Sequence, residues 1–245
     1  MGAEHTTANS TRLAPATIDA LLAYAARASW PAGFVIYQRG VKADGMFVVL
    51  QGRVVLRSRV RAGRGFVPWI ATTGETFGAE GLSAVPRYAT EARADEECTT
   101  LFLSTARFRT FLREQPLHAS ELLAQVLAER SILLEKLREL TTMSVEQRLI
   151  VALLRLATFD TFTRDDGCLV LNTGRYRLLC ELVGATRESV SLVLGRFTAE
   201  GWIERKGTSL IVRAQELSKR VEDLPFDDLL TASHEGTLGT TGALA

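Results

Sequence analysis

The stretch that decides the fold is residues 175–197, which read Arg-Tyr-Arg-Leu-Leu-Cys-Glu-Leu-Val-Gly-Ala-Thr-Arg-Glu-Ser-Val-Ser-Leu-Val-Leu-Gly-Arg-Phe. Apolar residues at positions 178, 179, 182 and 183 give its first half one helical face. Gly184 can take the left-handed conformation that ends a helix, and Thr186 is a good N-cap for a second helix. That second helix would bury Val190, Val193, Leu194 and Phe197. Two short helices joined by a glycine turn of about three or four residues are the helix-turn-helix pattern.

A hairpin is predicted directly after these two helices. Gly201 ends the second helix, and two β-rich runs, 202–205 and 210–213, flank Lys206-Gly207. Residues 172–213 contain seven basic and four acidic side chains, so the local balance is +3, whereas the whole chain has a formal net charge of +1. A local excess of positive charge suits a surface that faces phosphates, and the hairpin reads as a wing.

The first turn of the second helix in such a motif enters the major groove of DNA. Arg187 can then donate a bidentate pair of hydrogen bonds to guanine, and Glu188 can accept one from cytosine. Ser189 and Ser191 can contact base or phosphate. The alternative is that Arg187 and Glu188 only decorate a solvated helix end. The glycine turn, the apolar spacing and the wing favour the DNA-reading interpretation.

The first half of the chain has β-rich runs between glycines. The runs cover 34–37, 46–50, 54–56, 66–70 and 99–103. Short strands repeated at intervals of about eight to twelve residues indicate an antiparallel sandwich or roll. A short helix is predicted ahead of them, over residues 16–28.

Residues 118–140 contain no Gly or Pro and predict one long helix. Its apolar stripe is wide enough that it must be buried against the body of the protein or against another helix. We predict a dimer seam, with packing on its own domain as the alternative. The predicted seam residues are Leu122, Val126, Leu133, Leu137 and Leu140.

Composition excludes several other classes of protein. The three cysteines form no CxxC motif, which indicates reduced thiols, and no signal peptide or apolar run of about 18 residues is present, so we expect a cytoplasmic protein. A metal-binding cupin needs histidines on its strands, yet no histidine lies within residues 20–117. No Walker loop or GxSxG motif occurs. We therefore predict neither a metal site nor an enzyme.

The motifs together resemble the CRP/FNR family of transcription regulators. Residues 184–197, followed by Glu200-Gly-Trp-Ile-Glu204, resemble its recognition-helix signature, while 31–40 and 46–54 resemble the opening strands of its cyclic-nucleotide-binding-like β-roll. The resemblance covers about residues 20–220. It implies an α+β fold with an N-terminal antiparallel, jelly-roll-like β-roll, a long dimerisation helix and a C-terminal winged helix-turn-helix. The implied segments are an effector-sensing roll at 15–115, a dimerisation helix at 116–143, a DNA-binding domain at 144–220 and a flexible tail at 221–245.

The resemblance also implies site residues, with two departures. Leu192 stands where the family often has a second base-reading arginine, so contact with a thymine methyl, or no readout, is expected there. The first helix opens with Arg175-Tyr-Arg177 and lacks the usual capping hydroxyl and acid, which suggests additional phosphate contacts. The predicted base-reading residues are Arg187, Glu188, Ser189 and Leu192, and the predicted phosphate contacts are Arg175, Arg177, Ser191, Arg196 and Lys206.

The effector cassette of the resemblance covers residues 77–90, where we predict contacts from Gly78, Glu80, Arg87 and Tyr88. Arg87 matches the arginine that holds a phosphate in cyclic-nucleotide-binding relatives. Tyr88 replaces a small hydroxyl residue, and the acid appears one position late, as Glu80. These departures argue against cyclic AMP and favour another small anionic effector, or a purely structural role for Arg87. No other cofactor is predicted, since the cysteine cluster of an iron–sulfur sensor is absent.

The resulting prediction is a sequence-specific, dimeric DNA-binding regulator that reads a pseudo-palindromic site and is gated by a small anionic effector. Its implied partners are double-stranded DNA, a second copy of the chain and RNA polymerase, and not a membrane. Two alternatives stay open. One is a ligand-binding regulatory protein that acts through protein contacts without DNA, and the other is a constitutive regulator that needs no effector.

Overall fold

The computed structural model describes residues 12–59, 65–157 and 168–213, together with Leu217. The chain divides into two compact units. One comprises residues 10–143 and takes in 180–186, and the other is built from residues 144–179 and from Arg187 onward. The tail predicted over residues 221–245 lies outside the described residues.

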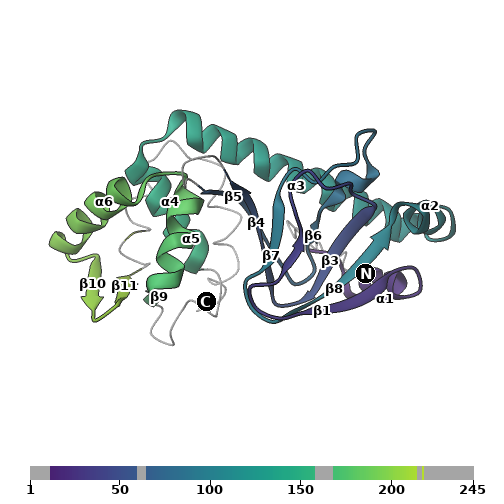
Figure 1. The fold of residues 1–245 in the computed structure, drawn as a ribbon, viewed down its shortest axis with the longest axis horizontal. Coiled ribbons are helices and arrows are strands. Elements are labelled where there is room, and N and C mark those ends of the chain that lie inside the picture. The colour runs from purple at the N-terminus through teal and green to yellow at the C-terminus, as the bar shows by residue number, and fades with distance from the viewer. Residues whose placement is uncertain (1–11, 60–64, 158–167, 214–216, 218–245) are drawn as a thin grey trace, which may run out of the picture. The chain divides into compact units, whose positions relative to one another are not determined.

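The N-terminal unit contains two antiparallel four-stranded sheets, which confirms the predicted β-roll (Figure 1). One sheet has the order β1-β8-β3-β6 and the other the order β2-β7-β4-β5. Their strands are β1 (Ala26–Trp30), β2 (Val35–Tyr37), β3 (Gly45–Gln51), β4 (Arg53–Arg59), β5 (Gly65–Thr72), β6 (Thr76–Phe77), β7 (Glu91–Ala94) and β8 (Cys98–Ser104).

The interior of the roll is strongly aromatic. Tyr37, Phe47, Phe77 and Tyr88 all lie in one buried cluster, and the rings of Phe47 and Phe77 stack with centroids 4.9 Å apart. Burying such rings contributes strongly to the stability of a small sandwich, because each removes a large apolar area from water. Phe77 and Tyr88 of this cluster belong to the predicted effector cassette at residues 77–90.

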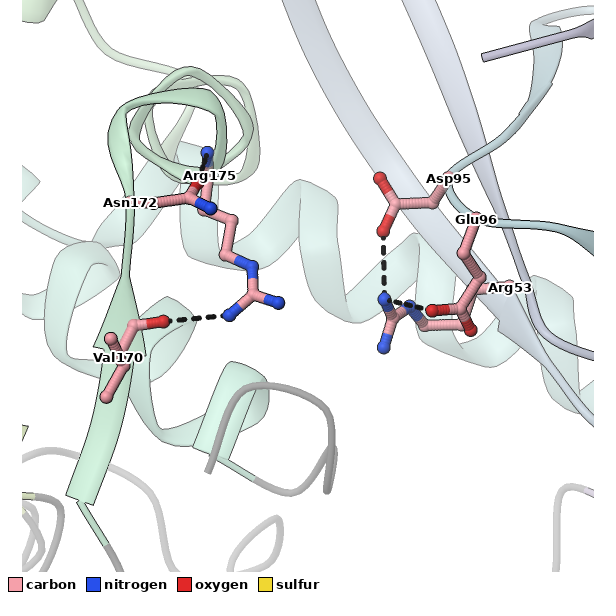
Figure 2. A network of polar contacts seen from close by, with 6 residues as sticks. All are labelled: Arg53, Asp95, Glu96, Val170, Asn172 and Arg175. Atoms are coloured by element: carbon pink, nitrogen blue, oxygen red, sulfur yellow. Dashed lines mark hydrogen bonds and ion pairs between the residues drawn. The ribbon is translucent and has the colours of Figure 1, made fainter. Parts of the chain in front are cut away.

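Charged residues close one edge of the roll. Arg53, only 7% exposed, lies at the start of β4 and forms ion pairs of 3.1 Å with Asp95 and 2.9 Å with Glu96 (Figure 2). Two carboxylates offset the cost of burying the guanidinium, which an unpaired arginine would pay in full. The pairs tie β4 to the turn between β7 and β8.

Helices of the same unit pack on a second core. They are α1 (Pro15–Leu22), a 3-10 turn η1 (Ala79–Leu82), α2 (Thr105–Glu114) and α3 (Pro116–Thr142). Leu21, Phe111 and Leu122 are fully buried together there. The predicted helix over residues 16–28 is wrong in its second half, since residues 26–30 form β1 and pair with β8.

The C-terminal unit combines helices with a small sheet. Its elements are α4 (Val145–Ala157), β9 (Cys168–Leu171), α5 (Thr173–Val183), α6 (Arg187–Ala199), β10 (Ile203–Lys206) and β11 (Ser209–Arg213). The last four residues of α5 belong to the stretch 180–186 that groups with the N-terminal unit. The three strands are antiparallel in the order β10-β11-β9. The predicted helix-turn-helix and wing are both confirmed. Among the described residues, no helix combines the length and apolar character needed to cross a membrane.

Candidate nucleic-acid interface

Helix α6 has one buried and one exposed face, as its apolar spacing predicts. Val190, Val193, Leu194 and Phe197 are between 0% and 4% exposed. The opposite face carries polar or small side chains and one leucine: Arg187, Glu188, Ser191, Leu192, Gly195 and Arg196 are exposed, and Ser189 is half-buried. Leu192 is 71% exposed.

The turn between α5 and α6 is built as the sequence predicts. Gly184 has a φ of 65°, a left-handed conformation that glycine adopts without strain. The backbone N–H groups of Gly184 and Ala185 both donate to the carbonyl of Cys180, at 3.0 and 3.3 Å. These bonds satisfy a carbonyl in the last turn of α5. Thr186 directly precedes the first residue of α6, the position predicted for an N-cap.

A tyrosine that the sequence reasoning missed fixes the start of α6. The hydroxyl of Tyr176 donates to the backbone carbonyl of Arg187 at 3.2 Å. The bond links α5 to the first turn of α6, where the two predicted base-reading charges lie. No periodic pattern marks such a contact, because it depends on how two helices cross.

Arg175 makes two hydrogen bonds within its own unit. Its Nη1 donates to the carbonyl of Val170 in β9 at 2.9 Å, while its backbone N–H donates to Oδ1 of Asn172 at 3.0 Å (Figure 2). Asn172 therefore supplies the cap that α5 was expected to lack. The guanidinium of Arg175 ties α5 to the sheet through one of its N–H groups, and a phosphate contact from Arg175 stays a prediction.

Arg196 is held by a neighbouring helix. Its Nη2 lies 2.7 Å from Oε2 of Glu146 in α4, and both side chains stay partly exposed, at 55% and 38%. Glu146 neutralises part of the charge that was predicted to face phosphate. An exposed pair of this kind adds little stability, so its main effect is to orient the guanidinium.

The wing has a two-residue turn. Lys206 pairs with Ser209, and Gly207, with φ 60°, supplies the left-handed residue that such a tight hairpin needs. The side chain of Lys206 is exposed at this tip, and that of Arg177 is exposed on α5.

The predicted effector cassette is closed by its own side chains. Tyr88 is 6% exposed and stacks on Tyr37, with ring centroids 3.6 Å apart. Arg87 donates from Nη1 to the carbonyl of Gly40 at 2.9 Å, and Oε1 of Glu80 accepts from the backbone of Ala89 at 3.0 Å. Gly78 has a φ of 69°, and a side chain there would contact the ring of Tyr37. The four predicted residues thus lie in one region, but Tyr88 points into the core.

Titratable groups near this cassette are shifted toward their neutral forms. Burial, followed by the charge of Glu80, raises the pKa of Tyr88 to about 12. Burial also raises the pKa of Glu129 in α3 to about 8, and the nearby carboxylates of Glu80 and Glu75 add to the shift. At neutral pH the Glu129 carboxyl therefore mostly keeps its proton. In the part of the chain that the structure describes, no cluster of His, Cys, Asp or Glu is arranged to hold a metal.

The predicted dimer seam is only partly available on α3. Leu122 is 1% exposed, and the half-buried Val126 packs against the same core, so in the single chain both face their own unit. Their place in the seam stays a prediction. Leu133 and Leu137 are 40% and 57% exposed, and Leu140 is half-buried. Four further exposed leucines on α3 were not among the predicted seam residues: Leu117, Leu123, Leu127 and Leu134, at 84%, 40%, 63% and 57%.

Two family models match the chain. The cyclic nucleotide-binding domain matches residues 27–115, and the Crp-like helix-turn-helix domain matches residues 147–220. These two matches fall on the β-roll and on the segment that contains α5, α6 and the wing.

Curated relatives are similar over most of the chain. A cyclic AMP receptor protein of Thermus thermophilus is 30% identical over 212 residues, which are 85% of this chain and 94% of the relative. A CRP-like cAMP-activated global transcriptional regulator of Mycobacterium tuberculosis is 27% identical over 205 residues, which are 82% of this chain and 90% of that protein.

Solved structures share the fold at lower identity. The c-di-GMP-responsive global regulator CLP of Xanthomonas campestris has a TM-score of 0.72 at 20% identity, over 81% of this chain and 99% of that one. A CRP/FNR family transcriptional regulator of Thermus thermophilus has a TM-score of 0.69 at 24% identity, over 80% and 98% of the two chains.

Proposed function

We propose that this chain reads a pseudo-palindromic DNA site as a dimer. The premise is that the chain belongs to the CRP/FNR family of DNA-binding transcriptional regulators. The observation that carries this proposal is the first turn of α6. Its inner face is buried in the C-terminal unit, while Arg187 and Glu188 project from the exposed side. A helix that is anchored on one face and charged on the other has the form needed to enter a major groove.

The base-reading roles follow from the chemistry of each exposed side chain. Arg187 offers a planar fork that matches the two acceptors of guanine, and Glu188 offers an acceptor for the amino group of cytosine. Leu192, one turn later, presents an apolar surface of the kind that contacts a thymine methyl. Ser189, being half-buried, would reach only the nearest base.

The phosphate-binding roles belong to residues around the helix. Lys206 at the tip of the wing and Arg177 on α5 are exposed cations, and Ser191 is a neutral donor on α6. Arg196 would contribute through an N–H group that Glu146 leaves available. Contacts of this kind position the protein on DNA and carry no sequence information of their own.

The dimer would form along α3. Leu123, Leu127, Leu134 and Leu137 follow one another at spacings of four, seven and three residues, and all are at least 40% exposed in the single chain. These spacings belong to the a and d positions of a heptad seam. Leu133 lies beside this stripe. We propose this face, rather than that of Leu122, as the site where a second copy packs.

We also propose that a small anionic effector binds near Arg87. Its binding would shift the population of arrangements of the paired α3 helices and so control DNA binding. Such an effector would have to take Arg87 from the Gly40 carbonyl and displace Tyr88 from Tyr37. The Tyr37–Tyr88 stack favours a second candidate, a constitutive regulator with a self-filled pocket. We further propose that the regulator contacts RNA polymerase and acts in the cytoplasm.

Selection of bound genomic fragments by the purified protein tests the DNA-reading role. Arg187→Ala should abolish the preference among sequences, whereas Lys206→Ala should weaken all duplexes alike and lower the salt slope by about 1. Arg113→Ala, on α2 of the other unit, is the matched control and should change neither property. Equal site preference in the parent protein and Arg187→Ala would refute base reading by Arg187. A parent protein that shows no preference among fragments would refute the DNA-reading proposal and favour regulation through protein contacts alone.

Tyr88→Ser tests the effector side. It removes the ring that fills the cassette and restores a small hydroxyl beside Arg87. Calorimetry with cyclic AMP should show tighter binding to Tyr88→Ser than to the parent protein, and Arg87→Ala in the same background should remove the gain. Tight binding of cyclic AMP to the parent would mean that the Tyr37–Tyr88 stack opens readily, and the constitutive candidate would then fail.

A further inference from the structure

Gly195 differs from the other glycines whose surroundings the structure describes. Eight of them have positive φ angles, so the backbone conformation requires glycine. A side chain at Gly45, Gly65 or Gly81 would collide with atoms closer than 3.0 Å. Gly195 has neither property, because its φ is ordinary and a Cβ there would meet nothing within 4 Å. Nothing in the described part of the chain explains a glycine at this position.

The position is also an unfavourable one for glycine. Gly195 lies in the interior of α6, nine residues into a 13-residue helix. Glycine is the poorest helix former after proline, because it loses the most backbone entropy when the helix forms. An alanine would fit and would stabilise the helix, so whatever benefits from the missing side chain lies outside the part of the chain that the structure describes.

The exposed face of α6 places Gly195 among the proposed DNA contacts. It follows Ser191 by four residues and Leu192 by three, so all three share one face of the helix. At a rise of 1.5 Å per residue, Gly195 lies about 12 Å along the axis from Arg187. The major groove is about 12 Å wide. When Arg187 reaches the base edges, Gly195 is therefore close to the wall of the groove.

We infer that Gly195 is the point at which the sugar-phosphate backbone at the groove wall contacts the main chain of α6. Without a side chain, the helix axis can approach the DNA more closely, and Arg187 and Leu192 reach deeper into the groove. Gly195 is then a positioning residue that contributes to affinity for every sequence. This inference rests on the proposed function and adds the place where the helix meets the DNA backbone.

The test measures Kd and thermal stability for Gly195→Ala and Gly195→Leu. The DNA substrates are a selected binding site and the same site with the base pair under Arg187 replaced. Gly195→Ala should raise the melting temperature and weaken both duplexes by the same factor, about tenfold, as expected when a side chain enters a close contact. Gly195→Leu should weaken both further. The raised melting temperature is a readout that excludes misfolding as the cause.

Ala199 provides the matched control. It is exposed on α6 one turn beyond Gly195, about 18 Å from Arg187 along the axis and past the width of the groove. Ala199→Leu should leave Kd unchanged. If Arg187→Ala loses site preference but Gly195→Leu binds as tightly as the parent protein, the Gly195 inference is overturned and the proposed function stands. If Arg187→Ala also binds like the parent, both fall.

Discussion

At the scale of single residues, the exposed face of α6 carries the side chains proposed to contact DNA, and hydrogen bonds from α5 and from its cap hold the two helices in position. Arg187 and Glu188 can be found from their position after a glycine turn. Tyr176 and Asn172 cannot, since one bonds to a neighbouring helix and the other caps α5 from outside the motif. Sequence patterns report faces and turns, whereas such bonds depend on the crossing of elements in space.

Tyr176→Phe should weaken DNA binding while leaving site preference intact. It removes one hydrogen bond to the Arg187 carbonyl, so the free energy of unfolding should fall by about 1 kcal/mol. The first turn of α6 would then be less well ordered before binding. Gel-shift titration gives the affinity and urea unfolding gives the stability.

Tyr24→Phe is the matched control for this prediction. The hydroxyl of Tyr24 donates to Glu114 in the N-terminal unit at 2.8 Å. Its loss should affect stability comparably and leave DNA affinity unchanged. Equal DNA affinities for Tyr176→Phe and the parent would show that the Tyr176 hydroxyl does not position α6.

The raised pKa of Glu129 predicts how stability depends on pH. The folded protein keeps this proton up to about pH 8, while an unfolded glutamate loses it near its ordinary pKa of 4.5. The folded state therefore binds more protons between these values, and its stability should fall as pH rises through that window. Glu129→Gln should flatten this part of the curve and raise the melting temperature at pH 8. Melting curves from pH 5 to pH 8 test this, and parallel curves for the two proteins would contradict it.

At the scale of elements, periodicity predicted the types of most segments but not all of their boundaries. The β-rich runs correspond to β2, β3, β4, β5 and β8, each bounded by turn residues. Residues 26–28 are alanine-rich and were predicted as helix, yet they form β1 because β8 offers a complete antiparallel partner. Tertiary pairing outweighs helix propensity there.

Helix α3 shows the limit of reading a face from sequence. Leucines cover so much of its surface that two seams fit the pattern, one through Leu122 and one through Leu123. Only the position of the roll decides between them, since it buries Leu122 and leaves Leu123 and Leu127 exposed. The same ambiguity arises in any helix that must pack on its own domain and on a partner.

Leu127→Glu should convert the dimer to a monomer. The substitution places a charge in the centre of the proposed seam, where it would lose its hydration on association. Analytical ultracentrifugation measures the result. Leu117→Glu, at a position that is 84% exposed and off the heptad stripe, should leave the dimer intact. A dimeric Leu127→Glu protein with native stability would place the interface elsewhere.

At the scale of the whole molecule, charge is distributed rather than abundant. A formal net charge of +1 gives no long-range signal for DNA. In the proposed dimer, binding comes from a local array of cations that is present in two copies. Two weak half-site contacts held by one dimer act with a high effective concentration, so affinity is gained without a strongly basic protein.

The affinity of the proposed dimer for DNA should depend strictly on the spacing of the two half-sites. A two-fold dimer presents its two α6 helices to successive major grooves on one side of the duplex, about one helical turn apart. Inserting about five base pairs turns the second half-site to the opposite side, so affinity should fall to that of an isolated half-site. Leu127→Glu should bind the original and the lengthened site equally, because a monomer contacts only one half. Titration of both proteins against both duplexes measures these affinities. If the insertion lowered the affinity of the parent and of Leu127→Glu equally, α3 would not be the element that joins the two copies.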